Sequence, residues 1–450
     1  MRNKIRTLST VLLCIFVYTS SLEAQDNNYW NIQYGTRSTL LGGTVIGSVS
    51  DLSATYYNPG AIALFPDIKF ILSAQVYQLD NYKIKDGAGK GKDLDYSSLI
   101  PSPNFVAFNI KFDFLGDDRL AISVLTRQNI NFEFVSRIID SVDVIQSSPG
   151  KVAGGIDLSK QFDDIWGGIT YATKFNKVIG LGFTGYLAFA NLKSSNEVIL
   201  QAFEEQTGDI ASFTDIQNYR FNNLRTLLKA GVGVNLSPLT MGLSVTTPSL
   251  NILGTGSAGT HLFVSGLDTS RFQSNYQDEI KSEYKSSWSV GFGAAYKFEK
   301  IKLHFSCEWF DAVNKFFVLD TEPYLSQSSG VELTNDLTNE SKSVINYGLG
   351  IDYFAGDSLS FSASFITDFS AGVENTQTNL APYSGSNLYH IAGGVSFIVW
   401  KTDLTLGLVY TFGSHTVENN IALTPEADGD ISQESELAYS QIKVLLGFEL

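Results

Sequence analysis

Two glycine-rich stretches are the first places where this sequence could bind a nucleotide or a phosphate. Gly180-Leu181-Gly182-Phe183-Thr184-Gly185 matches the dinucleotide-binding pattern G-x-G-x-x-G. That pattern binds a pyrophosphate where a strand ends and a helix begins, and no helix is expected after this stretch. Residues 87–92 (GAGKGK) have the wrong spacing for a phosphate loop and no Ser or Thr after the lysine. We interpret the first stretch as small residues on the inner face of a strand and the second as a loop tip.

No other group of residues indicates catalysis or metal binding. The carboxylate pairs Asp117-Asp118 and Asp163-Asp164 lie beside expected turns or strand starts, where solvated side chains are expected. A G-x-S-x-G nucleophile motif is absent from the sequence. The four histidines, His261, His304, His390 and His415, form no spaced pair. We therefore predict that the protein is not an enzyme and needs no cofactor and no metal.

The first 24 residues have the pattern of an export signal. Arg2, Lys4 and Arg6 precede a mostly apolar stretch of about ten residues, and Ala24 before Gln25 suits signal cleavage. A membrane-anchoring helix is the alternative, but the stretch is short and interrupted by Ser and Thr. The processed chain would keep one cysteine, Cys307, so it could form no internal disulfide.

Composition narrows the class of protein. The formal net charge is −15, which disfavours nucleic acid as a partner because phosphate binding needs a basic surface. After the signal no apolar run approaches the roughly 20 residues of a membrane-spanning helix. The aromatic content is high at 13%. An exported, aromatic-rich chain of this kind is either a membrane β-barrel or a soluble secreted β-protein.

Alternation of apolar and polar residues predicts an all-β fold. Trp288, Val290, Phe292, Ala294 and Tyr296 share one face of a strand, because side chains alternate across a pleat. Similar patterns recur about fourteen times between Ile68 and Leu450, over about 8 to 12 residues each. An even number of strands of this length suits a transmembrane antiparallel β-barrel.

The connections favour a barrel over a sandwich because short and long ones alternate. The short links are Leu115–Arg119, Asn176–Val178, Ser237–Thr240, Glu299–Lys302, Ala355–Ser358 and Trp400–Asp403. Long polar loops are expected near residues 79–103, 135–163, 190–222, 248–285, 310–343, 368–387 and 413–437. Short turns on one rim and long loops on the other are typical of bacterial outer-membrane barrels. An even strand count places both chain ends on the short-turn rim, which is periplasmic.

Residues 25–66 do not share this alternation. We therefore predict that they form a compact segment that fills the barrel lumen. Asp51 can cap a short helix that runs through Tyr57. Asn58 can cap a further turn, with Pro59 at its first position, where the missing N–H costs nothing. The expected organisation is a signal (1–24), a plug or hatch (25–66) and a barrel (67–450).

This segment resembles the hatch of the long-chain fatty acid outer-membrane transporters (FadL/TodX family). The resemblance rests on Gly42-Gly43, Asp51 and Tyr57-Asn58-Pro59, with Gly60 where the family has Ala. It implies a fourteen-stranded monomeric barrel for passive uptake of hydrophobic molecules such as long-chain fatty acids or aromatic hydrocarbons. It also implies that Asp51 and Asn58-Pro59-Gly60 take part in gating. Ligands would leave sideways into the outer-membrane lipid, near a kinked strand for which Leu125–Phe134 is the best candidate.

Other functions remain open for such a barrel. A structural or partner-binding barrel of the same superfamily, in protein secretion or surface attachment, is the main alternative. A porin for polar solutes is disfavoured by residues 25–66. Phe448, close to the end of the last strand, suits insertion by the barrel assembly machinery.

Overall fold

The computed structural model describes eleven stretches of the chain: residues 22–23, 27–65, 69–88, 91–112, 115–145, 148–204, 208–266, 270–373, 385–400, 402–419 and 433–450. The expected cleavage site between Ala24 and Gln25 lies outside these stretches, as do Gly89 and Lys90 in the middle of the second glycine-rich motif. Within them, no helix has the length and apolar character needed to cross a membrane.

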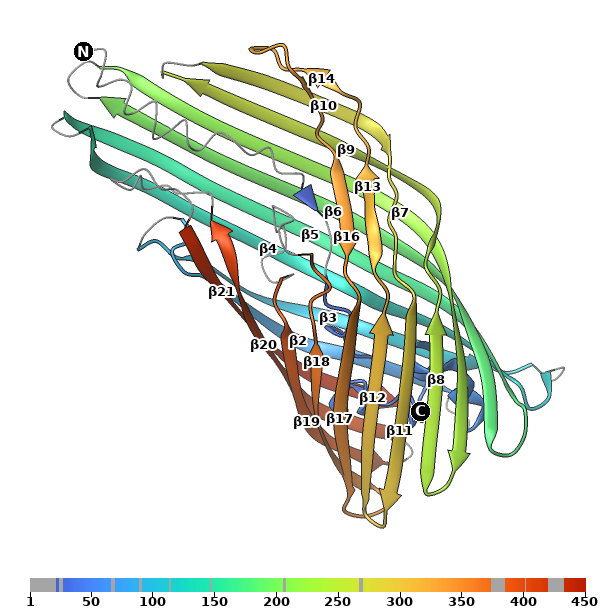
Figure 1. Ribbon diagram of the computed structural model, residues 1–450. Coiled ribbons are helices and arrows are strands. Elements are labelled where there is room, and N and C mark those ends of the chain that lie inside the picture. Colours follow the sequence, from blue (N-terminus) through green and yellow to red (C-terminus); the bar gives the residue numbers. More distant parts are fainter. Residues whose placement is uncertain are drawn as a thin grey trace.

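Fourteen strands form a closed antiparallel ring, which confirms the predicted fold class (Figure 1). Two further strands, β9 and β10, branch from β7, and the ring closes through the pairing of β7 with β8. The ring strands are β2 (Phe70–Ile84), β3 (Leu94–Ile110), β4 (Arg119–Ile145), β5 (Ser148–Lys174), β6 (Ile179–Glu204), β7 (Ile210–Leu236), β8 (Leu239–Thr246), β11 (Ser289–Phe298), β12 (Ile301–Phe310), β17 (Val344–Phe354), β18 (Leu359–Asp368), β19 (Leu388–Val399), β20 (Thr402–Asn419) and β21 (Gln433–Glu449).

The ring strands expose apolar side chains and bury polar ones, the reverse of a soluble β-protein. In β17, Ile345, Leu349 and the other outward residues are 41–62% exposed. Their neighbours Asn346 and Asp352 point inward and are completely buried. An apolar outer band with polar groups inside is what a barrel in lipid requires.

The six short connections are confirmed, but most of the predicted long loops are not loops. Strands β4 to β7 continue for 26 or 27 residues each, well beyond the expected 8 to 12. Polar residues in the stretches predicted as loops, such as Arg137, Lys193 and Arg220, instead lie exposed on these long strands. Inward residues such as Phe134, Phe162 and Phe221 pack into an apolar cluster that stabilises the extension.

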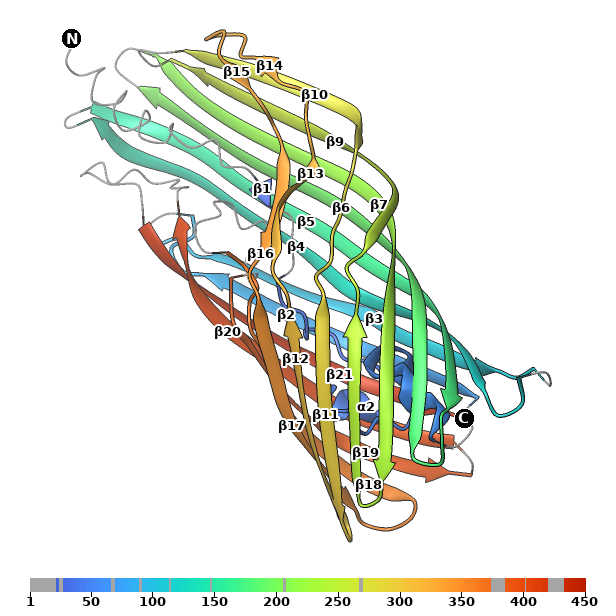
Figure 2. The same ribbon diagram turned by 45° about the vertical axis from the view of Figure 1, so that its right-hand side comes forward.

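The regions 248–285 and 310–343 also form strands. They contain β9 (Leu250–Ser265), β10 (Arg271–Lys281), β13 (Val313–Leu319), β14 (Tyr324–Leu325), β15 (Glu332–Leu333) and β16 (Leu337–Ser341), and β16 also pairs with β1 (Leu22–Glu23). Figures 1 and 2 show these strands at the end of the barrel opposite the short turns.

Residues 27–65, here called the inner segment, lie inside the ring toward the end with the short turns (Figure 2). The inner segment contains α2 (Arg37–Leu40), α3 (Ala54–Tyr57) and the 3-10 helix η2 (Pro59–Ala63). Nearly all of its side chains are buried. The N-cap of η2 is Asn58, whose side chain accepts a hydrogen bond from the Gly60 N–H at 3.2 Å, and Pro59 follows it as predicted.

A row of small residues on the inner wall receives the inner segment. Its members are register partners, each lying opposite the next, on the six adjacent strands β6, β7, β8, β11, β12 and β17: Gly180, Gly233, Gly242, Gly293, Ser306 and Gly348. A Cβ at Gly293 would lie 2.5 Å from the Gly47 nitrogen, and one at Gly348 would lie 2.8 Å from Thr44 Cγ2. The inner segment therefore lies so close to the wall that side chains at these glycine positions would collide with it.

The G-x-G-x-x-G motif belongs to this contact surface and not to a nucleotide site. A Cβ at Gly182 would lie 2.5 Å from the Pro59 carbonyl oxygen. Gly185 faces away, and a Cβ there would meet only Leu228 Cδ2, at 3.7 Å.

We predict that Gly182→Ala destabilises the folded barrel while Gly185→Ala leaves it nearly unchanged. The new methyl group at Gly182 would displace the inner segment, and overpacking of this kind costs about 1–3 kcal/mol. Urea unfolding midpoints of the two variants in detergent provide the measurement. Since both changes remove a glycine from the same strand, equal midpoints would contradict the proposed contact.

Candidate functional site

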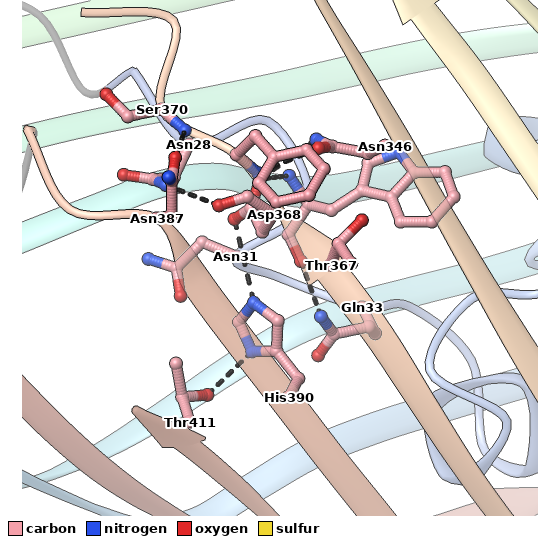
Figure 3. A network of polar contacts seen from close by, with 12 residues as sticks. Asn28, Asn31, Gln33, Asn346, Thr367, Asp368, Ser370, Asn387, His390 and Thr411 are labelled. Atoms are coloured by element: carbon pink, nitrogen blue, oxygen red, sulfur yellow. Dashed lines mark hydrogen bonds and ion pairs between the residues drawn. The ribbon is translucent and has the colours of Figure 1, made fainter. Parts of the chain in front are cut away.

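The first residues of the inner segment are held by buried hydrogen bonds to the end of β18. Asp368 Oδ1 accepts from the Trp30 main-chain N–H at 2.9 Å, and the Asp368 carbonyl accepts from Asn28 Nδ2 at 2.9 Å. The His390 ring lies 3.6 Å from Asp368 Oδ2 and bonds Thr411 on its other nitrogen. Figure 3 shows these polar side chains converging on Asp368 from the inner segment and the wall.

A second anchor is ionic and joins α2 to the wall. Arg37 forms an ion pair with Asp352 of β17. The same carboxylate contacts His304 Nε2 at 2.7 Å, and His304 Nδ1 contacts the Ser48 hydroxyl at 2.7 Å. Both His304 and His390, which form no spaced pair in the sequence, are buried on inward faces and contact the anchors of the inner segment.

Asp51 organises the inner segment from within. Its Oδ1 accepts from the Ser53 N–H at 2.7 Å, and its Oδ2 accepts from the Ser38 hydroxyl at 3.1 Å. The N-cap of α3 is Ser53, two residues later than the predicted cap. Burial raises the pKa of Asp51 above its ordinary value, although the hydrogen bonds from Ser53 and Ser38 oppose this shift.

Asn58, Pro59 and Gly60 attach the other end of the inner segment to β6 and β7. Asn58 Nδ2 donates to the Ile46 carbonyl at 2.9 Å and to the Val232 carbonyl of β7 at 3.0 Å. A side chain at Gly60 would collide with the Gly180 carbonyl oxygen, 2.7 Å from its Cβ. Asn58 therefore links two turns of the inner segment to the wall, and Gly60 permits the close approach.

A cavity of about 50 Å³ lies above this contact and is rich in charge. Arg127, Arg225 and Lys229 line it together with two carboxylates, Asp164 and Glu308, and each of the five side chains is at least nine-tenths buried. Because a water needs about 10–15 Å³ of such space, the cavity holds only a few waters. Pockets for drug-sized ligands measure about 300–1,000 Å³, so such a ligand would fit only after movement of the lining.

The charges in this cavity are incompletely paired. Arg225 pairs with Asp164, which corrects the prediction that the Asp163-Asp164 pair is solvated. Glu308 lies 3.8 Å from Lys229 Nζ. Arg127 forms no ion pair with any described carboxylate, and its Nη1 lacks a hydrogen-bond partner. Cations therefore outnumber carboxylates in this cavity, so this part of the lumen is not lined by apolar side chains alone.

Backbone pairing between β3 and β4 ends part-way along both strands, and this unpaired stretch is here called the opening between β3 and β4. The two strands pair only from Ile110 with Leu120 to Phe105 with Leu125. Among the described residues beyond Leu125, the backbone pairing of β4 is with β5, and its register shifts between Thr126 and Gln128. This irregularity lies within the stretch Leu125–Phe134 that the sequence singled out in the third strand.

Two consecutive residues of the inner segment bond both edges of this opening. The Gln33 carbonyl accepts from Asn104 Nδ2 of β3 at 2.7 Å. The Tyr34 hydroxyl donates to the Thr126 carbonyl of β4 at 3.0 Å. Tyr34 itself is held by Tyr57, whose hydroxyl accepts its main-chain N–H at 2.9 Å. The sequence did not indicate these contacts, because no local pattern marks a contact between residues 71 or 92 positions apart.

The acidic, histidine and cysteine side chains that most often hold a metal ion do not cluster in the part of the chain that the structure describes. No three His, Cys, Asp or Glu side chains there come together as metal ligands. Asp118 bonds the Tyr171 hydroxyl beside its turn, and Asp117 is exposed. The single cysteine of the barrel, Cys307, is a free thiol on β12.

We predict that the stability of the wild-type protein falls, relative to Asp51→Asn, as the pH rises. The raised pKa means that the folded state holds a proton on Asp51 that the unfolded state has released, and this stabilisation is lost as the pH passes the folded pKa. Thermal unfolding from pH 4 to 9 gives the comparison. Asp117→Asn, at an exposed turn, is the control, and parallel curves for wild type and Asp51→Asn would exclude the effect.

Comparisons with known proteins give matches to solved structures only. No family model matches the sequence, and no curated protein matches it. A FadL homologue from Pseudomonas aeruginosa superimposes with a TM-score of 0.60 at 12% identity, over 94% of this chain and 99% of that one.

Two toluene transporters are similar in the same way. TodX of Pseudomonas putida gives a TM-score of 0.60 at 13% identity, over 93% of this chain and 98% of its own. TbuX of Ralstonia pickettii gives 0.57 at 10% identity, with coverage of 93% and 98%. At these identities the likeness concerns the fold, so the resemblance to the FadL/TodX family is confirmed at the level of a fourteen-stranded barrel of this architecture.

Proposed function

We propose that this protein is an outer-membrane channel for the passive uptake of hydrophobic small molecules. In this proposal the inner segment is a hatch, and the opening between β3 and β4 is a lateral exit. The observation that carries the proposal is the pair of contacts from Gln33 and Tyr34 to the two edges of that opening. A hatch that bonds both edges keeps the wall closed until it moves.

A lateral route has a physical advantage for an insoluble ligand. Apolar surface favours leaving water by about 25 cal/mol per Å², so a water-filled pore offers such a molecule little. Exit through the wall would deliver it directly into outer-membrane lipid. The apolar outer face of the ring supports a location in that membrane, and the chain would act as a monomer.

In the proposed orientation, both ends of the processed chain lie on the periplasmic side of the outer membrane. Residues 1–24 would be a cleaved export signal, and residues 67–450 would be inserted by the barrel assembly machinery. Short turns face the periplasm in barrels of this class. Leu450, which bonds Phe70 at the short-turn end, would then be periplasmic, as would the start of the processed chain.

The charged cavity favours an acidic ligand over a neutral hydrocarbon. The similar structures include toluene transporters and a FadL homologue, so their names leave both ligand types possible. Arg127 and Arg225 present nitrogen atoms without hydrogen-bond partners toward the lumen. A carboxylate would accept from these donors, and hydrogen bonds to charged groups contribute about 1.5–3 kcal/mol. A long-chain fatty acid has both an apolar chain that suits the lateral route into lipid and a carboxylate that this cationic cavity could bind.

We expect uptake of labelled oleate to require the protein and to fall about tenfold in Arg127→Met, which removes a cation without breaking an ion pair. Uptake of labelled toluene should not respond to this substitution. The comparison uses cells lacking the protein and cells restored with wild type, Arg127→Met or Lys193→Met, whose lysine is exposed on the outer face.

If cells with and without the protein take up both compounds equally, the channel proposal is refuted. A structural or partner-binding barrel would then be the better account, and stable protein partners should be recovered with it. Toluene uptake that depends on the protein without oleate uptake would refute only the acidic ligand.

A further inference from the structure

A small polar pocket lies beside the opening between β3 and β4. Its volume is about 10 Å³, enough for one water or one ion. The lining residues come from the inner segment, β2, β3, β4 and β21, and only Ile100 among them is aliphatic: Asn31, Gln78, Asp80, Tyr82, Ile100, Asn129, Asn131, Tyr439 and Gln441. Asn129 and Asn131 directly follow the register shift of β4.

Asp80 places a buried carboxylate at this pocket without a cationic partner. Its side chain is 3% exposed. Its oxygens accept hydrogen bonds from Gln78 Nε2 at 2.8 Å, Tyr439 Oη at 3.0 Å and Gln441 Nε2 at 2.5 Å. All three donors are neutral, and Asp80 forms no ion pair within the described residues. A buried carboxylate is costly unless a cation compensates its charge.

Three amide oxygens at the same pocket lack hydrogen-bond partners. They are Asn31 Oδ1, Asn129 Oδ1 and Gln441 Oε1, and the Asn31 and Gln441 side chains are more than nine-tenths buried. The amide nitrogens of Gln441 and Asn129 donate to Asp80 and Asp163, which fixes the direction of the oxygens.

Asn31 is positioned by its main chain, because its carbonyl accepts from Lys443 Nζ at 2.9 Å. Figure 3 shows the Asn31 side chain without a contact to the Asp368 network around it. Its amide oxygen is therefore available to the pocket.

We propose that this pocket binds a Ca²⁺ ion through the Asp80 carboxylate and the amide oxygens of Asn31, Asn129 and Gln441. The donors are all hard oxygens, which suit Ca²⁺ and offer nothing to a metal that prefers nitrogen or sulfur. A water has only two hydrogens to donate, so one water would leave an amide oxygen unsatisfied.

Ca²⁺ fits better than Mg²⁺ because the ligands come from four separate elements. Mg²⁺ needs nearly ideal octahedral geometry at about 2.0–2.1 Å, whereas Ca²⁺ accepts 6 to 8 oxygens at variable angles. With a single carboxylate the affinity should be low, about 10⁻⁴–10⁻³ M, as in other extracellular calcium sites.

The bound ion would cross-link the inner segment to the wall on both sides of the opening. Asn31 belongs to the inner segment, Asp80 and Gln441 to β2 and β21, and Asn129 to β4. This inference concerns binding alone and does not depend on the transported molecule.

Terbium luminescence tests the site on the purified full-length protein in detergent, because Tb³⁺ replaces Ca²⁺ and nearby tyrosines sensitise its emission. Tyr82 and Tyr439 line the pocket. We expect saturable emission on tyrosine excitation that millimolar Ca²⁺ displaces at concentrations at least several-fold below those of Mg²⁺. Asp80→Asn should weaken Tb³⁺ binding about tenfold or more, because ligand charge sets affinity in such sites. Asp117→Asn, at an exposed turn, should not change it.

Asn31→Ala is a second variant, which keeps the Asp80 carboxylate and should weaken Tb³⁺ binding several-fold. It provides the test if circular dichroism shows that Asp80→Asn does not fold. Emission unchanged in every correctly folded pocket variant would overturn the proposal. Displacement by Mg²⁺ at the same concentration as Ca²⁺ would also overturn the assignment to Ca²⁺.

Discussion

The structure depends on backbone-to-backbone contact between the inner segment and the wall. Gly180, Gly233 and Gly242 on three neighbouring strands leave no side chains where the turns around Asn58 approach. A ring of fourteen strands is wide enough to hold such a segment, but ordinary side chains on these inward positions would fill the space it occupies. The contact sets the height of the inner segment and thereby places Gln33 and Tyr34 at the opening between β3 and β4.

Apolar packing, as between Tyr34 and Phe105, is only part of what attaches the inner segment to the wall, and polar contacts supply the rest. The anchors at Asp368 and Asp352, like the Asn58 hydrogen bonds, use groups that water could solvate after release. The net value of one such hydrogen bond is only about 0.5–1.5 kcal/mol, because water replaces it. A segment held only by interlocking apolar side chains would expose more apolar surface on moving, at a cost that grows with area.

The sequence predicted what depends on local pattern and missed what depends on distant residues. Alternation and turn chemistry identified the fourteen-stranded barrel and all six short connections, and Asn58-Pro59 correctly predicted a capped turn. The halves of β4 to β7 far from the short turns were predicted as loops because their outward faces become polar beyond the apolar band. The charged cavity joins Arg127, Asp164, Arg225 and Glu308 from four strands, and no spacing along the chain indicates that closure of the ring brings them together.

In the proposed mechanism, the inner segment must move before a ligand can pass. A reversible tether tests this requirement: Thr36→Cys with Gly447→Cys, in a Cys307→Ser background. A Cβ at Gly447 would lie 2.8 Å from the Thr36 Cβ, so a displacement of about 1 Å gives the Cβ–Cβ distance of about 3.8 Å that a disulfide needs. Oleate uptake by cells carrying this variant should be abolished when the disulfide forms and restored when it is reduced. Undiminished uptake through the disulfide-locked barrel would contradict the account.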